Sequence, residues 1–240
     1  MQERSASLQE ALAELEHFSY TLVHDLRAPL RAIRGYSELL LEQCAHLSPA
    51  HSQYLQRSNV AVARMDQLIV DALDYSKIVR QQFPLVPVNC NDLLESLFDS
   101  YPQFHEARAS ISIESPLPCV LGNLALLTQC FSNLLTNALK FVAPGQAPRV
   151  RIFAQDLGSR VRICFEDNGI GIAEEYHAKV FQMFHRLNQD YEGTGIGLAL
   201  VKKAAERMRG AVGVQSISGH GSHFWLELDK ALVPQGGGNG

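Results

Sequence analysis

The sequence predicts an α+β protein in which a long helical hairpin precedes a mixed α/β layer structure. Residues 1–82 repeat apolar side chains at helical spacing, and a break at Ser48-Pro49 divides them into two helices. Residues 83–230 alternate helix-like and strand-like segments instead. We therefore predict two domains, 1–82 and 83–230, followed by a flexible glycine-rich tail over residues 231–240.

The composition narrows the functional classes. A net charge of -4 argues against a broad nucleic-acid-binding face, so we expect no nucleic-acid partner. No apolar run approaches the ~18 residues needed to cross a bilayer, so we expect a cytoplasmic segment without membrane contact. The 5 cysteines are scattered and lack a C-x-x-C pair, which favours free thiols packed as small hydrophobic side chains.

Both helices of the hairpin carry an apolar stripe. The first stripe comprises Leu8, Leu12, Leu15, Leu22, Leu26 and Ile33, and the second Leu55, Val62, Met65, Ile69 and Ala72. Ser48 is a suitable N-cap for the second helix, with Pro49 at its first position. One hairpin cannot bury both stripes, whereas two copies in a four-helix bundle can. We therefore predict a homodimer through residues 1–82.

The following region predicts a layer of helices on a sheet. Helices are expected at 89–104, 124–141, 174–184 and 198–208. Strands are expected at 111–113, 149–153, 161–166, 213–217 and 223–228, with a turn at residues 156–158.

His24 is the first candidate for chemistry. By helical geometry it points away from the stripe of Leu22 and Leu26, toward solvent. A neutral imidazole has a nucleophilic ring nitrogen, and the adjacent Asp25 is placed to hold the tautomer and accept a proton. Pro29 interrupts the helical hydrogen bonding and predicts a bend. On these residues alone, a solvated surface histidine is the simpler interpretation.

A second group, Asn133, Asn137 and Lys140, is spaced i, i+4, i+7 and shares one helical face. Amide oxygens are hard ligands for Mg²⁺, and an ammonium neutralises phosphate charge. The alternative is an ordinary polar helix face. Asparagine is a poor helix former, however, so two of them favour a functional interpretation.

Two glycine-containing segments complete the pattern. The segment EDNGIGI at 166–172 follows a predicted strand, where the Asp167 carboxylate can accept a hydrogen bond from an exocyclic amine and Gly169 and Gly171 permit a tight turn. The segment GTGIGL opens a helix, whose N-terminus favours an anion. Its members are Gly193, Thr194, Gly195, Ile196, Gly197 and Leu198. An ordinary turn remains the alternative for the first segment, and the second is weak by itself.

Together these segments resemble known motifs. The string HDLRAPL at 24–30 resembles the H-box of HisKA-type histidine kinases. The three later groups resemble the N, G1 and G2 boxes of the GHKL ATPase fold, in that order. Residues 180–187 resemble its F box, and the Gly219–Ser222 stretch a further glycine motif. The sequence is thus similar to the catalytic core of a sensor histidine kinase, with a lid most like that of the phytochrome-associated kind.

The resemblance implies a role for each site residue. His24 would be the phosphoacceptor, with Asp25 assisting transfer. In the second domain, an α/β sandwich of the GHKL type, Asn137 would ligate Mg²⁺ with support from Asn133, and Lys140 would contact the phosphates of ATP. Asp167 would read adenine, beside the turn of Gly169 and Gly171. The stretch from Gly193 through Thr194, Gly195 and Gly197 to Leu198 would line the phosphates.

The implied activity is ATP-dependent autophosphorylation of His24 and transfer to a response-regulator receiver domain. Two departures from the family pattern are visible. Ala28 stands where many members have threonine or asparagine, which implies weak or absent phosphatase activity. Asn123 stands where aspartate is common, with little expected effect. The alternatives are a GHKL ATPase of another class, such as a topoisomerase or chaperone ATPase, and a degenerate kinase acting as a nucleotide-binding dimeric scaffold.

Overall fold

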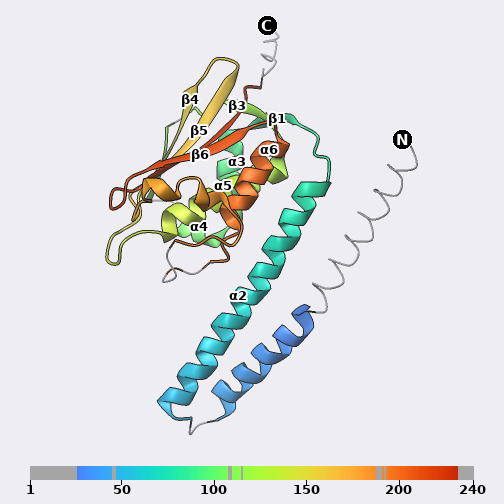
Figure 1. Cartoon of the computed structure of the whole chain (residues 1–240), viewed down its shortest axis with the longest axis vertical. Helices are drawn as coiled ribbons and strands as arrows, with labels where there is room; N and C mark the ends of the chain where they lie inside the picture. The colour runs from blue at the N-terminus through green and yellow to red at the C-terminus, as the bar shows by residue number, and fades with distance from the viewer. Residues whose placement is uncertain are drawn as a thin grey trace, which may run out of the picture. The chain divides into compact units, whose positions relative to one another are not determined.

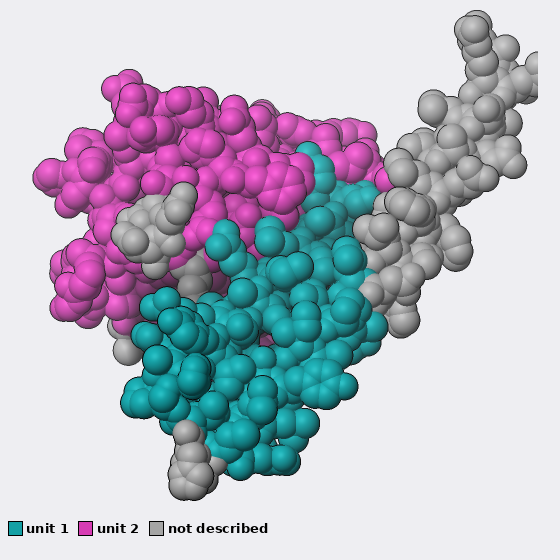
Figure 2. Space-filling model, turned by 60° about the horizontal axis from the view of Figure 1, so that its bottom comes forward, with its two compact units in different colours: residues 1–77 teal, residues 78–240 magenta. Residues whose placement is uncertain are grey.

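The computed structural model describes residues 26–44, 47–107, 110–114, 116–187, 191 and 193–231. The chain divides into two compact units, Met1–Lys77 and Ile78–Gly240, which Figure 2 colours separately. Along the described part of the chain, no helix is both long and apolar enough to cross a bilayer.

The first unit contains an antiparallel helical hairpin, formed by a helix over residues 26–43 and by α2 (Pro49–Arg80) (Figure 1). The predicted start of α2 is confirmed, because the hydroxyl of Ser48 accepts a hydrogen bond from the backbone N–H of His51 at 3.3 Å. Leu30 and Val62 are buried. The stripe residues Leu8 to Leu22 lie outside the described residues.

The second unit is built on a five-stranded sheet with strand order β2-β4-β5-β7-β6 and a separate two-stranded sheet β1-β3 (Figure 1). Its strands are β1 (Val86–Asn89), β2 (Ile111–Ile113), β3 (Cys119–Gly122), β4 (Val150–Asp156), β5 (Arg160–Asp167), β6 (Ala211–Ser216) and β7 (Ser222–Asp229). Its helices are α3 (Cys90–Ser100), α4 (Pro102–Glu106), α5 (Leu124–Lys140) and α6 (Gly197–Arg207). The β2–β4 pair is parallel, and the other neighbours in the larger sheet are antiparallel.

The core lies between the sheet and the helices. α5 and α6 contact one sheet face, and the rings of Phe131 on α5 and Phe165 on β5 meet edge to face at 5.1 Å. β7 shows the strict alternation of a strand covered on one side, because its residues are buried at every second position. The helices therefore shield one sheet face from solvent, and the polar positions of β7 point to the other face.

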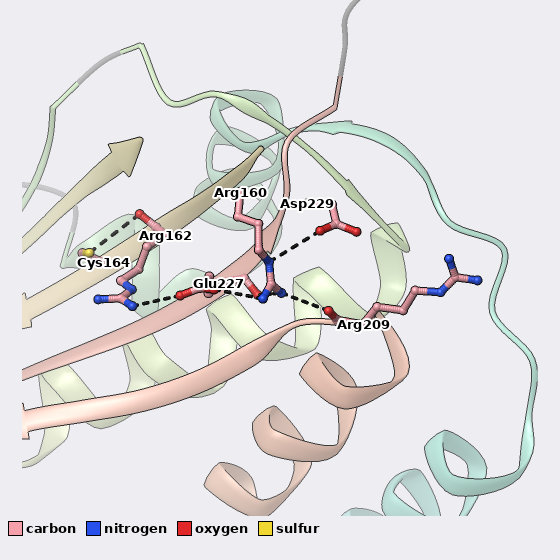
Figure 3. Close-up of polar contacts among 6 residues, drawn as sticks. All are labelled: Arg160, Arg162, Cys164, Arg209, Glu227 and Asp229. Carbon is pink, nitrogen blue, oxygen red and sulfur yellow. Dashed lines mark hydrogen bonds and ion pairs between the residues drawn. The ribbon is translucent and has the colours of Figure 1, made fainter. Parts of the chain in front are cut away.

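That other face carries a charged network (Figure 3). The carboxylate of Glu227 bridges two guanidinium groups, with Arg160 at 2.9 Å and Arg162 at 2.8 Å. Arg160 also donates to the backbone carbonyl of Arg209 at 2.9 Å and lies 3.5 Å from Asp229. The network ties β5, β7 and the segment after α6 together.

Two predicted helices differ in the structure, and two strands are additional. The predicted helix at 174–184 is wrong: the segment forms two short 3₁₀ turns, η2 (Glu174–Tyr176) and η3 (Lys179–Phe181). Val180 is the buried residue of these turns, so no continuous apolar face stabilises a longer helix. The predicted helix at 89–104 is divided at Tyr101, because Pro102 has no N–H and starts a new helix. The short strands β1 and β3 were not predicted.

Candidate functional site

The site is organised around α5, which begins directly after β3. The side-chain oxygen of Asn123 caps this helix, accepting from the backbone N–H groups of Ala125 at 3.1 Å and Leu126 at 3.3 Å. Seven residues of α5 face the core: Leu126, Leu127, Cys130, Phe131, Leu134, Leu135 and Ala138. The burial of this face leaves the polar positions of the helix facing outward.

Asn133, Asn137 and Lys140 are all partly exposed on α5, as their spacing requires. The amide nitrogen of Asn133 donates to the backbone carbonyl of Gln129 at 2.9 Å, which fixes the side chain along its own helix. Its oxygen faces the start of α6, since a Cβ on Gly197 would lie 2.6 Å from it. The predicted N-box face and the predicted G2 segment are therefore in contact, and a side chain at 197 would displace the amide of Asn133.

Asp167 ends β5, and its carboxylate faces the turn that follows the strand. One oxygen accepts from the backbone N–H of Gly169 at 2.8 Å and from that of Ser222 at 3.1 Å. Burial raises the pKa of the Asp167 carboxyl to about 6, against the lowering effect of these two hydrogen bonds. The fold thus keeps the Asp167 carboxylate buried in spite of the desolvation penalty and orients it with backbone N–H groups. Titratable groups perturbed in this way are common at functional sites.

The turn after Asp167 is held against the C-terminal end of α5. The backbone N–H of Ile170 donates to the carbonyl of Phe141 at 2.8 Å, and Ile170 accepts in turn from Gly219 at 2.7 Å. Gly171 has φ of +68°, and a Cβ there would lie 2.0 Å from the carbonyl oxygen of Ile217. A side chain at 171 is therefore excluded both by conformation and by space.

The segment from Gly193 to Gly197 leads into α6 and lies beside Lys140. A Cβ on Gly193 would lie 2.9 Å from the ammonium nitrogen of Lys140. The hydroxyl of Thr194 accepts from the N–H of Ile196 at 3.4 Å, and the Gly195 carbonyl accepts from the N–H of Phe184 at 2.9 Å. Leu198 lies in the first turn of α6. No side chain caps the start of α6, so its first N–H groups and the nearby ammonium make the region suitable for a phosphate chain.

Sequence reasoning missed Tyr191. Its hydroxyl donates to the backbone carbonyl of Val142 at 2.9 Å, and its ring lies 5.2 Å from that of Phe141. The guanidinium of Arg186 donates to the Tyr191 carbonyl at 2.6 Å. These contacts join the segment before Gly193 to the end of α5. An aromatic residue close to a glycine-rich segment was the available signal.

Asn168 was also missed as a structural member of the site. Its side chain accepts from the N–H of Arg149 at 2.8 Å and donates to the carbonyl of Ala147 at 3.0 Å. It thereby holds the connection between α5 and β4 against the turn that follows Asp167.

His24 and Asp25 lie outside the described residues, and so does the predicted outward orientation of the imidazole. Ala28 and Pro29 are both exposed on the helix over residues 26–43. Ala28 therefore offers a surface methyl group and no polar group.

The cysteines behave as buried apolar side chains or as surface thiols. Cys90, Cys130 and Cys164 are buried, and no disulfide joins the five free cysteines. Burial raises the pKa of the Cys90 and Cys130 thiols to about 12, so both remain protonated at neutral pH.

A helix-backed sheet with three polar segments gathered at the end of α5 defines a nucleotide-binding ATPase domain. Comparison with known families agrees: residues 122–232 match the histidine kinase-, DNA gyrase B- and HSP90-like ATPase family, and residues 14–81 match the His Kinase A (phospho-acceptor) domain. The chain therefore belongs to the sensor histidine kinases and contains their catalytic core.

Individual relatives extend along nearly the whole chain. Cyanobacterial phytochrome A of Nostoc sp. (strain PCC 7120 / SAG 25.82 / UTEX 2576) is 33% identical over 96% of this chain and 30% of its own length. Sensor histidine kinase AruS of Pseudomonas aeruginosa is 32% identical over 99% of this chain and 26% of its own length. The crystal structure of full-length ShkA in complex with AMPPNP is 31% identical, with TM-score 0.65, over 91% of this chain and 47% of that one. The chain thus spans less than a third of these two curated relatives.

Proposed function

We propose that this chain is an ATP-dependent protein histidine kinase that phosphorylates its own His24 and passes the phosphoryl group to an aspartate of a response regulator. In this proposal residues 1–82 form the dimerisation and phosphotransfer domain, and residues 83–230 form the ATP-binding domain. The observation that carries it is the presence, in one chain, of a phosphoacceptor-type hairpin and an ATPase-type domain. In that domain Asn133 and Lys140 face the glycine segment at 193–197, and the turn after Asp167 contacts the end of α5.

Different residues of the ATP-binding domain would contact the adenine and the phosphates of ATP. The free oxygen of Asp167 would accept a hydrogen bond from the adenine amino group, because its other oxygen is held by Gly169 and Ser222. The ammonium of Lys140 and the N–H groups at the start of α6 would neutralise the phosphates. AMPPNP in the ShkA complex is a nucleotide of the type this arrangement suits.

The donor set also suits Mg²⁺. The Asn137 amide offers a hard oxygen, and Mg²⁺ commonly takes only one or two protein ligands while keeping waters and substrate phosphates. Among the described residues no cluster of three His, Cys, Asp or Glu side chains offers a competing site for a softer metal. When bound beside Asn137, Mg²⁺ would offset the charge of the β- and γ-phosphates.

The transfer step uses the hairpin. A neutral imidazole nitrogen of His24 attacks the γ-phosphorus, an N–P bond forms, and the bond from that phosphorus to the β,γ-bridging oxygen breaks, releasing ADP. Asp25 accepts the proton that the imidazole loses. A receiver aspartate then takes the phosphoryl group, and the proton returns to the ring, which restores the neutral imidazole. The ATP-binding domain supplies position and charge neutralisation, and the hairpin supplies the nucleophile.

Dimerisation is part of the proposal, since a phosphoacceptor domain of this family implies it. Leu26, Ile33 and Leu40 follow one another at intervals of seven residues and are 43%, 48% and 46% exposed in the single chain. Exposed apolar side chains at seven-residue spacing form the kind of stripe that a partner helix buries. We therefore propose that a second copy packs against residues 1–82 to form a four-helix bundle.

The test is incubation with γ-labelled ATP followed by mapping of the modified residue. Wild-type protein is expected to acquire an acid-labile, base-stable label on His24 and to lose it to a receiver domain. His24→Ala should acquire no label while binding ATP within about twofold of wild type, because the nucleophile lies outside the ATP site. His105→Ala, which alters an exposed histidine on α4, is the matched control and should label normally.

The other functions predict different results. ATP hydrolysis without any protein label would identify an ATPase of another class. ATP binding with neither label nor hydrolysis would identify a nucleotide-binding scaffold. Asn137→Ala separates the roles further: it should remove the Mg²⁺-dependent part of ATP affinity together with the label.

A further inference from the structure

The two helices of the hairpin are joined by an ion pair beside the H-box. The guanidinium Nε of Arg27 donates to the carboxylate Oδ1 of Asp66 at 2.7 Å, across 39 residues of sequence. The two side chains are 34% and 48% exposed. A pair this exposed contributes little to the stability of folding, so its interest lies in what it orients.

The position of the pair along the hairpin is specific. Leu30 lies three residues after Arg27, and Val62 lies four residues before Asp66, and both are buried. In an antiparallel hairpin these four positions follow one another along the same face of each helix. The ion pair therefore continues the buried seam between the helices, at the end that leads toward His24.

Pro29 explains why this turn benefits from a contact with the other helix. Proline has no N–H, so the helical hydrogen bond to the carbonyl of residue 25 cannot form. The helix therefore lacks one of its hydrogen bonds within one turn of Arg27. A side chain anchored to α2 restrains the same turn from the other helix, and arginine suits this because its planar group holds a fixed direction.

We propose that Arg27 and Asp66 are positioning residues for autophosphorylation, their ion pair holding the H-box turn in register with α2 so that His24 meets the γ-phosphate in a productive orientation. This inference rests on the proposed function of His24. It assigns Arg27 a task directed at α2, not at the phosphoryl group. Loss of the pair should then slow transfer without weakening ATP binding, which takes place in the other domain.

Other ion pairs of the hairpin provide a control. Arg34 and Glu38 lie 3.7 Å apart on the same helix, at spacing i, i+4. Such a pair cannot hold one helix against another. Reversing the charges of Arg34 and Glu38 changes the same kinds of charge on the same hairpin without altering the ion pair between the helices.

The experiment is a charge-reversal cycle on the full chain. Arg27→Asp and Asp66→Arg are each expected to lower the autophosphorylation rate at saturating ATP about 10-fold or more, with the KM for ATP within about twofold of wild type. The double variant restores the opposite charges in exchanged positions and should return to within about threefold of wild type. The variants Arg34→Glu and Glu38→Arg should each change the rate less than about twofold.

Each outcome is decisive. A double reversal as slow as the singles would overturn the ion-pair role, because it would mean that Arg27 acts directly on the phosphoryl group or on another partner. Equal rates in all variants would overturn it as well. A wild type that never labels would refute the proposed function itself, and this result is distinct from a labelled wild type whose double variant stays slow.

A neutral cycle covers variants that fail to fold. Arg27→Gln, Asp66→Asn and their combination keep side-chain size while removing charge. If the two residues act as a unit, the double variant is no slower than the slower single variant. Independent losses that multiply would contradict the proposal. Circular dichroism and sedimentation of each variant confirm an intact dimer.

Discussion

The helical hairpin and the ATP-binding unit contain similar apolar side chains but bury them differently. On the hairpin, Leu26, Ile33, Leu39 and Leu40 are all more than two-fifths exposed. On α5, by contrast, every leucine from Leu126 to Leu135 is nearly inaccessible because the helix lies on the sheet. The second unit closes its own core within one chain, whereas the first presents an apolar surface that a single copy does not cover.

This difference separates two physical tasks. A nucleotide site needs groups fixed within fractions of an ångström, which a densely packed core provides. An apolar surface that a second copy covers forms an interface whose stability depends on the concentration of that partner. Changes on the exposed apolar surface of the hairpin should therefore act through association, and changes in the ATP-binding unit through nucleotide affinity or folding.

The largest effect should come from a charge placed on the exposed stripe of Leu26, Ile33 and Leu40, and it should be an effect on dimerisation. Ile33→Glu puts a carboxylate at a position that each copy would bury, so a symmetric interface carries the penalty twice. We expect the dimer dissociation constant to rise by at least ~1,000-fold, measured by sedimentation equilibrium. Leu157→Glu, at a residue 46% exposed in the ATP-binding unit, is the control and should leave association unchanged.

Asp167→Asn should act on the ATP-binding unit, where we expect it to weaken ATP binding about 100-fold. The asparagine oxygen can still accept from Gly169 and Ser222, but its NH₂ group would face the adenine amine as a second donor. Calorimetric titration with ATP measures the loss. Unchanged affinity would show that Asp167 does not contact adenine.

The same carboxyl predicts a pH dependence. Burial raises the pKa of Asp167 to about 6, from 3.8 in the absence of the fold, so the folded chain binds this proton more readily than the unfolded chain. The ionised Asp167 carboxylate therefore lowers the free energy of unfolding above pH 6. This loss diminishes as the pH falls toward 4 and the folded chain takes up the proton. ATP affinity should change in the opposite direction, weakening below pH 6 as the carboxylate is protonated. Titrations between pH 5 and 8 should show this slope in wild type and none in Asp167→Asn.

The charged face of the sheet tests the stability of the ATP-binding unit alone. Glu227 is 15% exposed and bridges Arg160 and Arg162, so Glu227→Gln leaves two guanidinium groups with a weaker partner. We expect a loss of about 1–2 kcal/mol in the free energy of unfolding, with dimerisation unchanged. Urea denaturation followed by the fluorescence of Trp225 measures it, since the chain has 1 tryptophan. Glu114→Gln, on a residue 57% exposed, should change stability by less than ~0.5 kcal/mol.

The smallest effect is expected at Asn123. Its oxygen caps α5, while its amide nitrogen donates to the carbonyl of Pro84 at 3.3 Å. Asn123→Asp keeps the cap and favours the helix dipole but loses the donor, so the net change should stay within ~0.5 kcal/mol. Asn123→Ala removes both contacts and should cost about 1 kcal/mol of unfolding free energy. Equal losses in the two variants would show that the cap contributes nothing.

Much of the site was readable from local patterns. The face of Asn133, Asn137 and Lys140 follows from 3.6 residues per turn, and the start of α2 follows from Ser48-Pro49. Where periodicity was weak, prediction failed: the segment at 174–184 contains apolar residues without a continuous buried face, and it forms only two short turns.

Sequence by itself determined most of the longer helices and strands and the polar groups they display, because helix and strand periods are set by the backbone of each segment. Only the tertiary structure decided that Asp167 would meet Ser222, since this contact requires β5 and β7 to pair across 55 residues. The same holds for Tyr191 on Val142 and for Arg27 on Asp66. Which distant segments meet depends on burying apolar faces across the whole chain, and no local pattern contains that free energy.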